Sequence, residues 1–178
     1  MRRVVTLLTL LFTVLCSTTL LAFEPDSSSK MELDVKVAIL NIKAADPSIE
    51  AFFENSAGYA VFPSVGKGGF IIGGAFGRGL VIVDEVVDGY TSMSQATIGF
   101  QIGGQKYSQF IFFKDDTALN HYKRGNFEFG AQASAVAIVA GASADAAYDA
   151  GVAIFTVASR GLMFEGSVGG QRFSYESK

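Results

Sequence analysis

The sequence predicts an α+β fold, in which N-terminal helices precede a glycine-rich, mainly antiparallel β-sheet or barrel-like sandwich with one inserted helix. All 20 glycines lie between residues 58 and 170, interleaved with valine, isoleucine, phenylalanine and tyrosine. This composition is typical of strands separated by turns. The segment before Gly58 has no glycine and carries a helix stop signal at Asp46-Pro47. A chain of 178 residues, 49% of them hydrophobic, fits one globular domain.

Residues 1–22 are expected to be a secretory signal peptide rather than part of this domain. Arg2 and Arg3 precede an uncharged apolar run that ends at the small residue Ala22. The alternative is an uncleaved membrane anchor, since the run is just long enough to span a bilayer. Cys16, the only cysteine, lies in this run, so the mature domain has no disulfide. We therefore expect an exported, periplasmic or secreted protein, and a bacterial periplasm fits better than an animal secretome.

The domain is expected to span residues 31–178, after a solvated linker over residues 23–30. Residues 31–45 fit both strand and helix periodicity, and their length together with Asp46-Pro47 favours a helix. Asp46 can cap a second helix that begins with Pro47 and ends near Asn55.

About eight strands are expected after Gly58. Asp88-Gly89 is a hairpin turn signal, and an acid-capped helix is expected from Asp115 or Asp116 to Gly125. Residues 131–150 are ambiguous, because the alanine-rich pattern fits a strand and its end, from Ala144, also fits a short helix. The clearest strand patterns are Tyr59–Phe62, Gly69–Phe76, Leu80–Asp84, Thr97–Ile102 and Tyr107–Phe113. The last has no polar face at residues 110–113, so it is either buried or in contact with lipid.

One glycine-punctuated pattern occurs twice, first from Gly58 to Lys67-Gly68 and again from Gly151 to Arg160-Gly161. Both copies predict a short apolar strand, a turn with a basic tip and a second strand that ends in a glycine pair. Glycine inside a strand costs about 0.5–1 kcal/mol relative to alanine. Its repeated use predicts close backbone approach or positive φ at these positions.

Several classes of chemistry are disfavoured by the residues present. His121 is the only histidine, so neither a metal site nor a Ser-His-Asp hydrolase has the usual set of side chains. Residues 141–144 approach a nucleophile-elbow pattern around Ser143, but Asp145 stands where glycine is needed. The glycine clusters lack both phosphate-binding fingerprints and are flanked by strands. We expect no enzyme and no cofactor, and a net charge of −3 argues against a nucleic-acid partner.

Five basic residues near the expected glycine turns are the candidate binding residues: Lys67, Arg78, Lys106, Arg160 and Arg172. Backbone N–H groups in such turns form anion-binding concavities, and a cation near an anionic lipid surface adds about 1 kcal/mol. The five side chains are therefore predicted to form one anion-binding rim. The alternative is ordinary solvated turn charge.

The run from Gly58 to Gly79 closely resembles the SYLF domain, a lipid-binding domain of eukaryotic endocytic adaptors and secreted bacterial proteins. Residues 99–105, 112–119, 125–130 and 161–171 carry further matches, so the resemblance covers residues 32–175. It looks most like the bacterial branch with a signal peptide. The resemblance implies that segment 31–44, as an amphipathic helix, and Lys67 contact lipid. The segment departs from a basic helix because only Lys36 and Lys43 are cations inside it.

Together these observations predict a non-catalytic domain of the bacterial cell envelope that binds lipid or a membrane surface, with anionic (phospho)lipid head groups as ligands. The alternative is a structural envelope protein that associates with itself or with an envelope partner and has no specific lipid ligand. Actin, a partner of yeast members of the family, is not expected for an exported bacterial protein.

Overall fold

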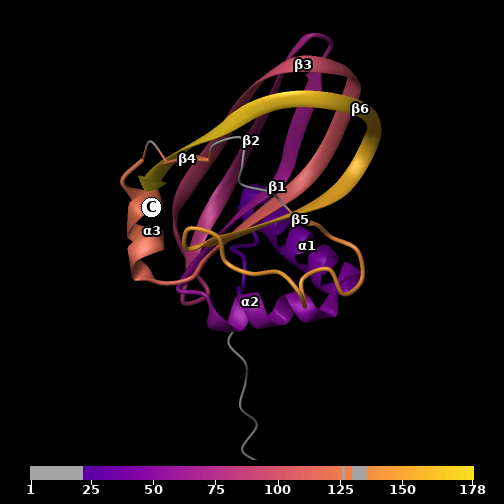
Figure 1. Ribbon diagram of the computed structural model, residues 1–178. Helices are drawn as coiled ribbons and strands as arrows, with labels where there is room; N and C mark the ends of the chain where they lie inside the picture. Colours follow the sequence, from indigo (N-terminus) through magenta and orange to yellow (C-terminus); the bar gives the residue numbers. More distant parts are fainter. Residues whose placement is uncertain (1–21, 126, 130–135) are drawn as a thin grey trace, which may run out of the picture.

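The computed structural model describes residues 22–125, 127–129 and 136–178, and shows one curled sheet with helices packed at one end (Figure 1). α1 (Lys30–Ala45) begins at Ser29, whose side chain accepts a hydrogen bond from the Glu32 N–H. A 3₁₀ turn, η1 (Pro47–Ile49), and α2 (Glu50–Asn55) follow. The Asp46 side chain accepts from the Ser48 N–H, so both expected helices and the cap are confirmed. Over the described residues, no helix combines the length and hydropathy needed to span a bilayer.

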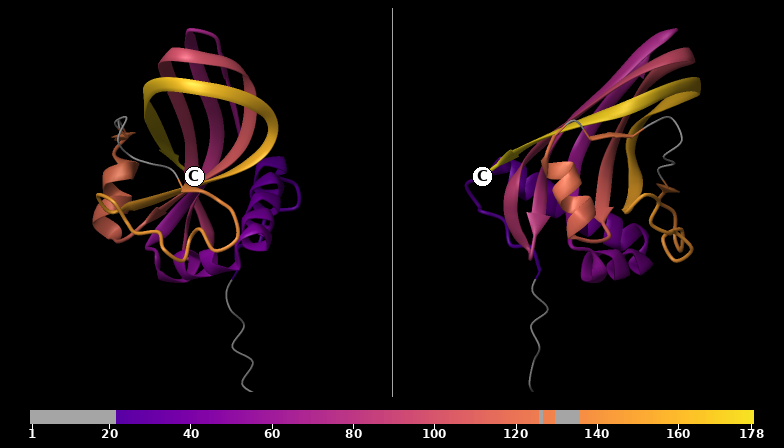
Figure 2. Two further views of the ribbon diagram at one scale, coloured as in Figure 1. Left: turned by 45° about the vertical axis from the view of Figure 1, so that its right-hand side comes forward. Right: turned by 60° about the vertical axis from the view of Figure 1, so that its left-hand side comes forward.

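The sheet consists of nested arcs (Figure 2). β1 (Gly58–Gly69) and β2 (Ile72–Val83) form the innermost hairpin. β3 (Val86–Phe113) encloses it, because its first half pairs with β2 and its second half pairs with β1. β6 (Val152–Ser177) encloses β3 in turn and pairs with it along nearly its whole length.

Three short elements border these arcs. α3 (Asp116–Lys123) begins at Asp115, whose side chain accepts from the Ala118 N–H, as expected. β4 (Phe127–Phe129) pairs antiparallel with the end of β6, and β5 (Val136–Ala137) pairs parallel with its beginning. The sheet is therefore mostly antiparallel, and it does not close into a barrel. The α+β prediction is confirmed.

The predicted turns are wrong at three places. Lys67 and Arg160 lie inside β1 and β6, and Asp88-Gly89 lies inside β3. The pairing continues through all of them, so the expected short strands merge into long ones. The β2–β3 reversal lies at Asp84 and Glu85, both of which have positive φ, as a two-residue turn of primed type requires. Residues 144–150 form turns and one isolated bridge, not a helix.

Helices cover both faces of the sheet at its base. On the outer face, α1 and α2 pack over a cluster that includes Phe110, Phe112 and Phe155. On the inner, concave face, α3 packs over a second cluster that includes Ile111 and Phe113. Residues 110–113 are all fully buried, because helices cover both of their faces. This resolves the expected choice between a buried strand and a lipid-facing one.

Two glycines of the repeated pattern have the expected constraints. A Cβ at Gly58 would lie 2.9 Å from the Ile82 carbonyl oxygen, and Gly151 has φ of +84°. The tightest position is Gly79, where a Cβ would lie 2.1 Å from the carbonyl oxygen of Val61. Gly79 faces the bulge in β1, and this close approach sets the local curvature.

The expected linker contains one buried residue. Phe23 is 3% exposed and belongs to the cluster under α1. Its carbonyl oxygen accepts a hydrogen bond from the Lys36 ammonium. The chain is thus anchored to the domain from Phe23 onward.

Candidate functional site

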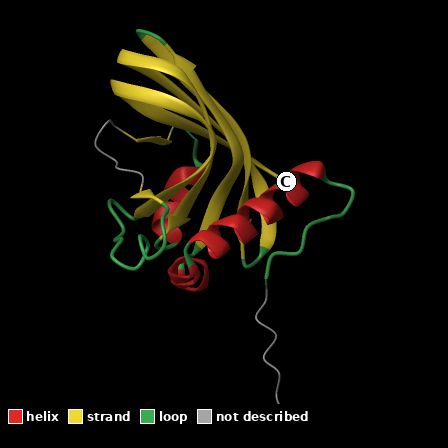
Figure 3. Ribbon diagram, turned by 90° about the vertical axis from the view of Figure 1, so that its right-hand side faces the viewer, coloured by secondary structure: helices red, strands yellow, loops and turns green. Residues whose placement is uncertain are grey.

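The most exposed apolar segment is the tip of the β1–β2 hairpin. Phe70, Ile71 and Ile72 are 58–74% exposed, and Ile98 on β3, which pairs with Ile72, is 71% exposed. Figure 3 shows this turn at the end of the sheet farthest from the helices. Isolated apolar residues on a surface are normal, but a contiguous apolar patch marks an interaction site. We call these four residues the apolar tip.

Three of the five predicted basic residues lie together on the outer face. Lys106 pairs with Gly66, Gly66 with Phe76, and Phe76 with Ser94. Ser94 in turn pairs with Arg172. Because directly paired residues share a face, Lys106, Phe76 and Arg172 form one row across the sheet.

Arg78 lies on the same face, since it is two residues beyond Phe76, and its guanidinium carbon is 5.9 Å from the centroid of the Phe76 ring. Lys106, Arg78 and Arg172 are exposed. We call these three cations, with Phe76, the basic row. Three of the five candidate cations therefore share one face of the sheet, and their role in binding an anion stays a prediction.

Lys67 does not join this group. It pairs with Ala75 and Gln105, which places it one residue out of phase with Gly66 and therefore on the inner face. It is half-buried there. The backbone of Arg160 pairs with that of Lys106, and its side chain lies outside the described part. The one motif lysine that the family resemblance indicates is thus separated from the exposed cations by the thickness of the sheet.

A bare strip of backbone separates the basic row from the apolar tip. Gly104 pairs with Gly68, Gly68 with Gly74, Gly74 with Ala96, and Ala96 with Gly170. A Cβ at Gly68 or Gly104 would make only ordinary contacts, so packing within the chain does not require glycine there. The outer face is therefore smooth between its cations and its apolar edge.

Ser143, the central residue of the rejected nucleophile motif, has a structural role, because it donates hydrogen bonds to the buried carboxylate of Asp46. The Asp46 carboxylate is fully buried and accepts from the Ser143 N–H and hydroxyl, both at 2.8 Å, and from the Gly141 N–H. Burial alone would raise the pKa of Asp46, but these hydrogen bonds and one from the Ser48 hydroxyl hold it well below the ordinary value. Ser143 therefore ties residues 141–143 to the start of η1. In the described residues, no group of three potential metal-binding side chains occurs.

The sequence reasoning missed the apolar tip. Residues 70–72 were assigned to the strand Gly69–Phe76, and the signal available was three successive apolar residues between glycines. It also missed the alignment of glycine pairs into the bare strip, because cross-strand register is not visible in a linear pattern.

Residues 94–178 match the model of a family described as Ysc84, Las17-binding protein actin regulator. This is the family to which the SYLF motifs point. Residues 94–178 are therefore similar to the SYLF family. The matched part begins within β3 and includes Lys106 and Arg172.

The chain is also similar to a curated protein, Beta cell expansion factor A from Aeromonas veronii. The two are 26% identical over 137 residues, which cover 76% of this chain and 52% of the relative. The chain thus spans about half the length of that relative.

Proposed function

We propose that this protein is a non-enzymatic membrane-binding domain that attaches to a lipid surface through the apolar tip and the basic row. The similarity of residues 94–178 to the SYLF family supports lipid binding in general. The observation that carries the proposal is the exposure of Phe70, Ile71 and Ile72 in succession at a projecting hairpin tip. We propose further that the lipid is anionic and belongs to the envelope of a bacterium that exports the chain.

The apolar tip supplies the sequence-independent part of the affinity. Burying an aliphatic or aromatic side chain completely is worth about 1.5–3 kcal/mol. The tip residues are already more than half exposed, so a membrane interface can cover them without any rearrangement of the core. Since no backbone hydrogen bond must break, most of this gain is available for attachment.

The basic row supplies a preference for anionic lipid. Arg78, Lys106 and Arg172 lie on the same face as Ile72, at the far side of the bare strip. Each cation near an anionic surface contributes about 1 kcal/mol, and salt screens this term. A head group at the basic row and acyl chains at the apolar tip match the order of polarity in a bilayer leaflet.

Vesicle co-sedimentation tests the proposal. Intact-mass measurement first establishes where the purified chain begins. The chain is then mixed with vesicles of phosphatidylcholine alone or of phosphatidylcholine with phosphatidylglycerol, which gives the surface a negative potential. We expect stronger partitioning to the anionic vesicles, and a loss of that preference at high salt. Phe70→Ser with Ile71→Ser is expected to reduce partitioning to both vesicles about tenfold.

Val139→Ser is the matched control for the tip, because Val139 is 68% exposed on a different segment. For charge, Lys106→Glu is compared with Lys114→Glu, since both lysines are exposed but only Lys106 is in the basic row. Equal partitioning of tip and control variants would contradict the proposal.

A stable oligomer that persists without lipid and dissociates in the tip variant would favour the self-associating envelope protein instead. The same apolar surface would then be a protein interface.

A further inference from the structure

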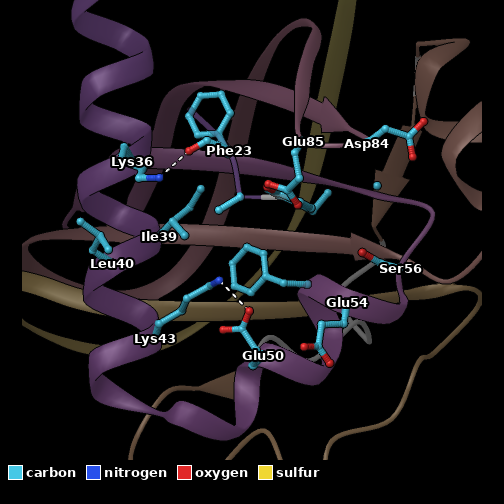
Figure 4. A pocket seen from close by; sticks show the side chains of 14 residues that line it. Phe23, Lys36, Ile39, Leu40, Lys43, Glu50, Glu54, Ser56, Asp84 and Glu85 are labelled. Carbon is cyan, nitrogen blue, oxygen red and sulfur yellow. Dashed lines mark hydrogen bonds and ion pairs between the residues drawn. The ribbon is translucent and has the colours of Figure 1, made fainter. Parts of the chain in front are cut away.

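A cleft of about 520 Å³ lies at the base of the domain, at the opposite end of the sheet from the apolar tip (Figure 4). Its walls come from four places: the start of the described chain, α1, α2 with the beginning of β1, and the β2–β3 turn. Its volume is in the range of small-molecule sites. The proposed membrane contact does not use this cleft, although its α1 wall lies in segment 31–44, for which the family resemblance implies lipid contact.

The two lysines of the cleft are already paired. The Lys43 ammonium lies 2.8 Å from the Glu50 carboxylate, and Lys36 contacts the Phe23 carbonyl oxygen and the Glu24 carboxylate. The cleft therefore has no cation left over for an anionic ligand such as phosphate.

The cleft is lined by more carboxylates than lysines. Among the described residues, the side chains of Glu54 and Asp84 have no recorded ion pair or hydrogen bond, although both line the cleft. Glu85, the fourth carboxylate of the lining, accepts from the Tyr59 hydroxyl at 2.9 Å. Three of the four lining carboxylates, those of Glu54, Asp84 and Glu85, thus have no cationic partner within the cleft.

A buried hydroxyl lies between the two unpaired carboxylates. The Ser56 oxygen is inaccessible to solvent and has no hydrogen-bond partner, which is a costly state for a buried polar atom. Figure 4 shows Ser56 at one side of the cleft with Asp84 and Glu54 on either side of it, while Lys36 and Lys43 come from α1 at the opposite side. This side of the cleft therefore has negative charge without a cation to balance it.

The cleft already accommodates one ammonium group in such a setting. The Lys43 nitrogen lies 4.5 Å from the centroid of the Phe53 ring and forms its ion pair with Glu50 from that position. A ring face and a carboxylate together are the usual surroundings of a bound organic cation. Phe53 and Tyr59 pack edge to face at 5.0 Å, so the aromatic wall is rigid.

We propose that this cleft binds a small organic cation, whose ammonium group lies against the Phe53–Tyr59 wall and interacts with the carboxylates of Glu54 and Asp84, next to the buried Ser56. The shared chemistry is an alkylammonium or quaternary ammonium group. It can belong to a free amine or to the head group of an amine-bearing lipid, and the two sources make different predictions.

Nuclear magnetic resonance titration of the purified, isotope-labelled chain with choline tests the inference. The control ligand is 3,3-dimethylbutan-1-ol, which has the shape of choline without its charge. We expect choline, and not the alcohol, to shift the signals of Ser56, Gly58 and Asp84. Glu54→Gln with Asp84→Asn should weaken choline binding about fivefold, or about 1 kcal/mol, whereas Asp145→Asn, an exposed acid outside the cleft, should leave it unchanged.

A short-chain phosphatidylcholine, used below its micelle concentration, distinguishes the sources. Tighter binding than choline at the same residues assigns the cleft to a lipid head group, and equal or weaker binding assigns it to a free amine. Equal shifts from choline and the neutral alcohol, or no shifts at the lining residues, would overturn the inference. The membrane proposal is judged separately, because the Phe70→Ser, Ile71→Ser variant should bind choline normally and the Glu54→Gln, Asp84→Asn variant should still partition to vesicles.

Discussion

The base and the upper part of this sheet are built from the same strands but differ in nearly every physical respect. At the base, helices cover both faces, and Phe110, Phe112 and Phe155 are fully buried. In the upper part, glycine rows replace side chains and Ile72 and Ile98 are largely exposed. One strand, β3, passes through both environments. The difference indicates that the base stabilises the fold, whereas the upper part presents a surface.

The largest expected effect of a single change is in the base. Phe112→Ala removes a ring that contacts four others at centroid distances of 4.9–5.9 Å, those of Phe52, Phe53, Tyr59 and Phe155. It should lower the free energy of unfolding by about 3–5 kcal/mol, measured by chemical denaturation. A loss below about 1 kcal/mol would mean that the base is not the main source of stability.

The next largest effects are expected from glycine substitutions, whose cost in stability should differ between the base and the upper part. Gly79→Ala places a Cβ against the Val61 carbonyl oxygen and should cost about 2 kcal/mol. Gly68→Ala, in the bare strip, meets no close contact and should change stability by no more than about 0.5 kcal/mol. Both values come from the same denaturation experiment, and equal costs would show that the bare strip is as tightly constrained as the base.

The hydrogen bonds to the Asp46 carboxylate should make part of the stability of the base depend on pH. Its pKa is lowered in the folded state, so its contribution is present above the ordinary value of about 3.9 and is lost as the pH falls below it. Asp46→Asn should therefore cost about 2 kcal/mol at pH 7 and progressively less in acid. Urea denaturation at several pH values measures the loss of stability. Asp145→Asn is the control, because Asp145 is an exposed acid just after residues 141–143, which bind Asp46. A cost that does not vary with pH would exclude a role for the charge.

The smallest effect on stability is expected at the apolar tip. Ile71→Ser alone should change the free energy of unfolding by no more than about 0.5 kcal/mol, because Ile71 is 59% exposed. The same variant should partition measurably less to vesicles. Loss of stability and vesicle binding together would indicate that the tip is part of the folded core.

The local elements could be predicted from the sequence, and the long-range pairing could not. The caps at Asp46 and Asp115 depend on neighbouring residues, and both are confirmed. The strand at residues 110–113 is confirmed too, but the sequence left open whether it is buried or in contact with lipid, and only the structure shows that it is buried. The turns expected at Lys67 and Arg160 are wrong because glycine next to a basic residue fits both a turn and a strand beside a bare strip.

Only part of the candidate site could be predicted from the sequence. The sequence indicated five cations without stating their faces, and a shift of one residue moves a side chain to the other side of a sheet. That is why Lys67 lies apart from Lys106 and Arg78. The cleft could not be foreseen, since it brings Phe23, Lys43 and Asp84 together from three separate segments.

The nesting of the arcs also fixes an order of assembly. The β1–β2 hairpin can close as soon as Val83 has been made, but the first half of β3 receives its outer neighbour only when residues up to Ser177 are present. Lys178 then contacts Glu32 on α1, which joins the end of the chain to its first helix. Because distant pairings are slow to form, the pairing of β3 with β6 is expected to complete the sheet last.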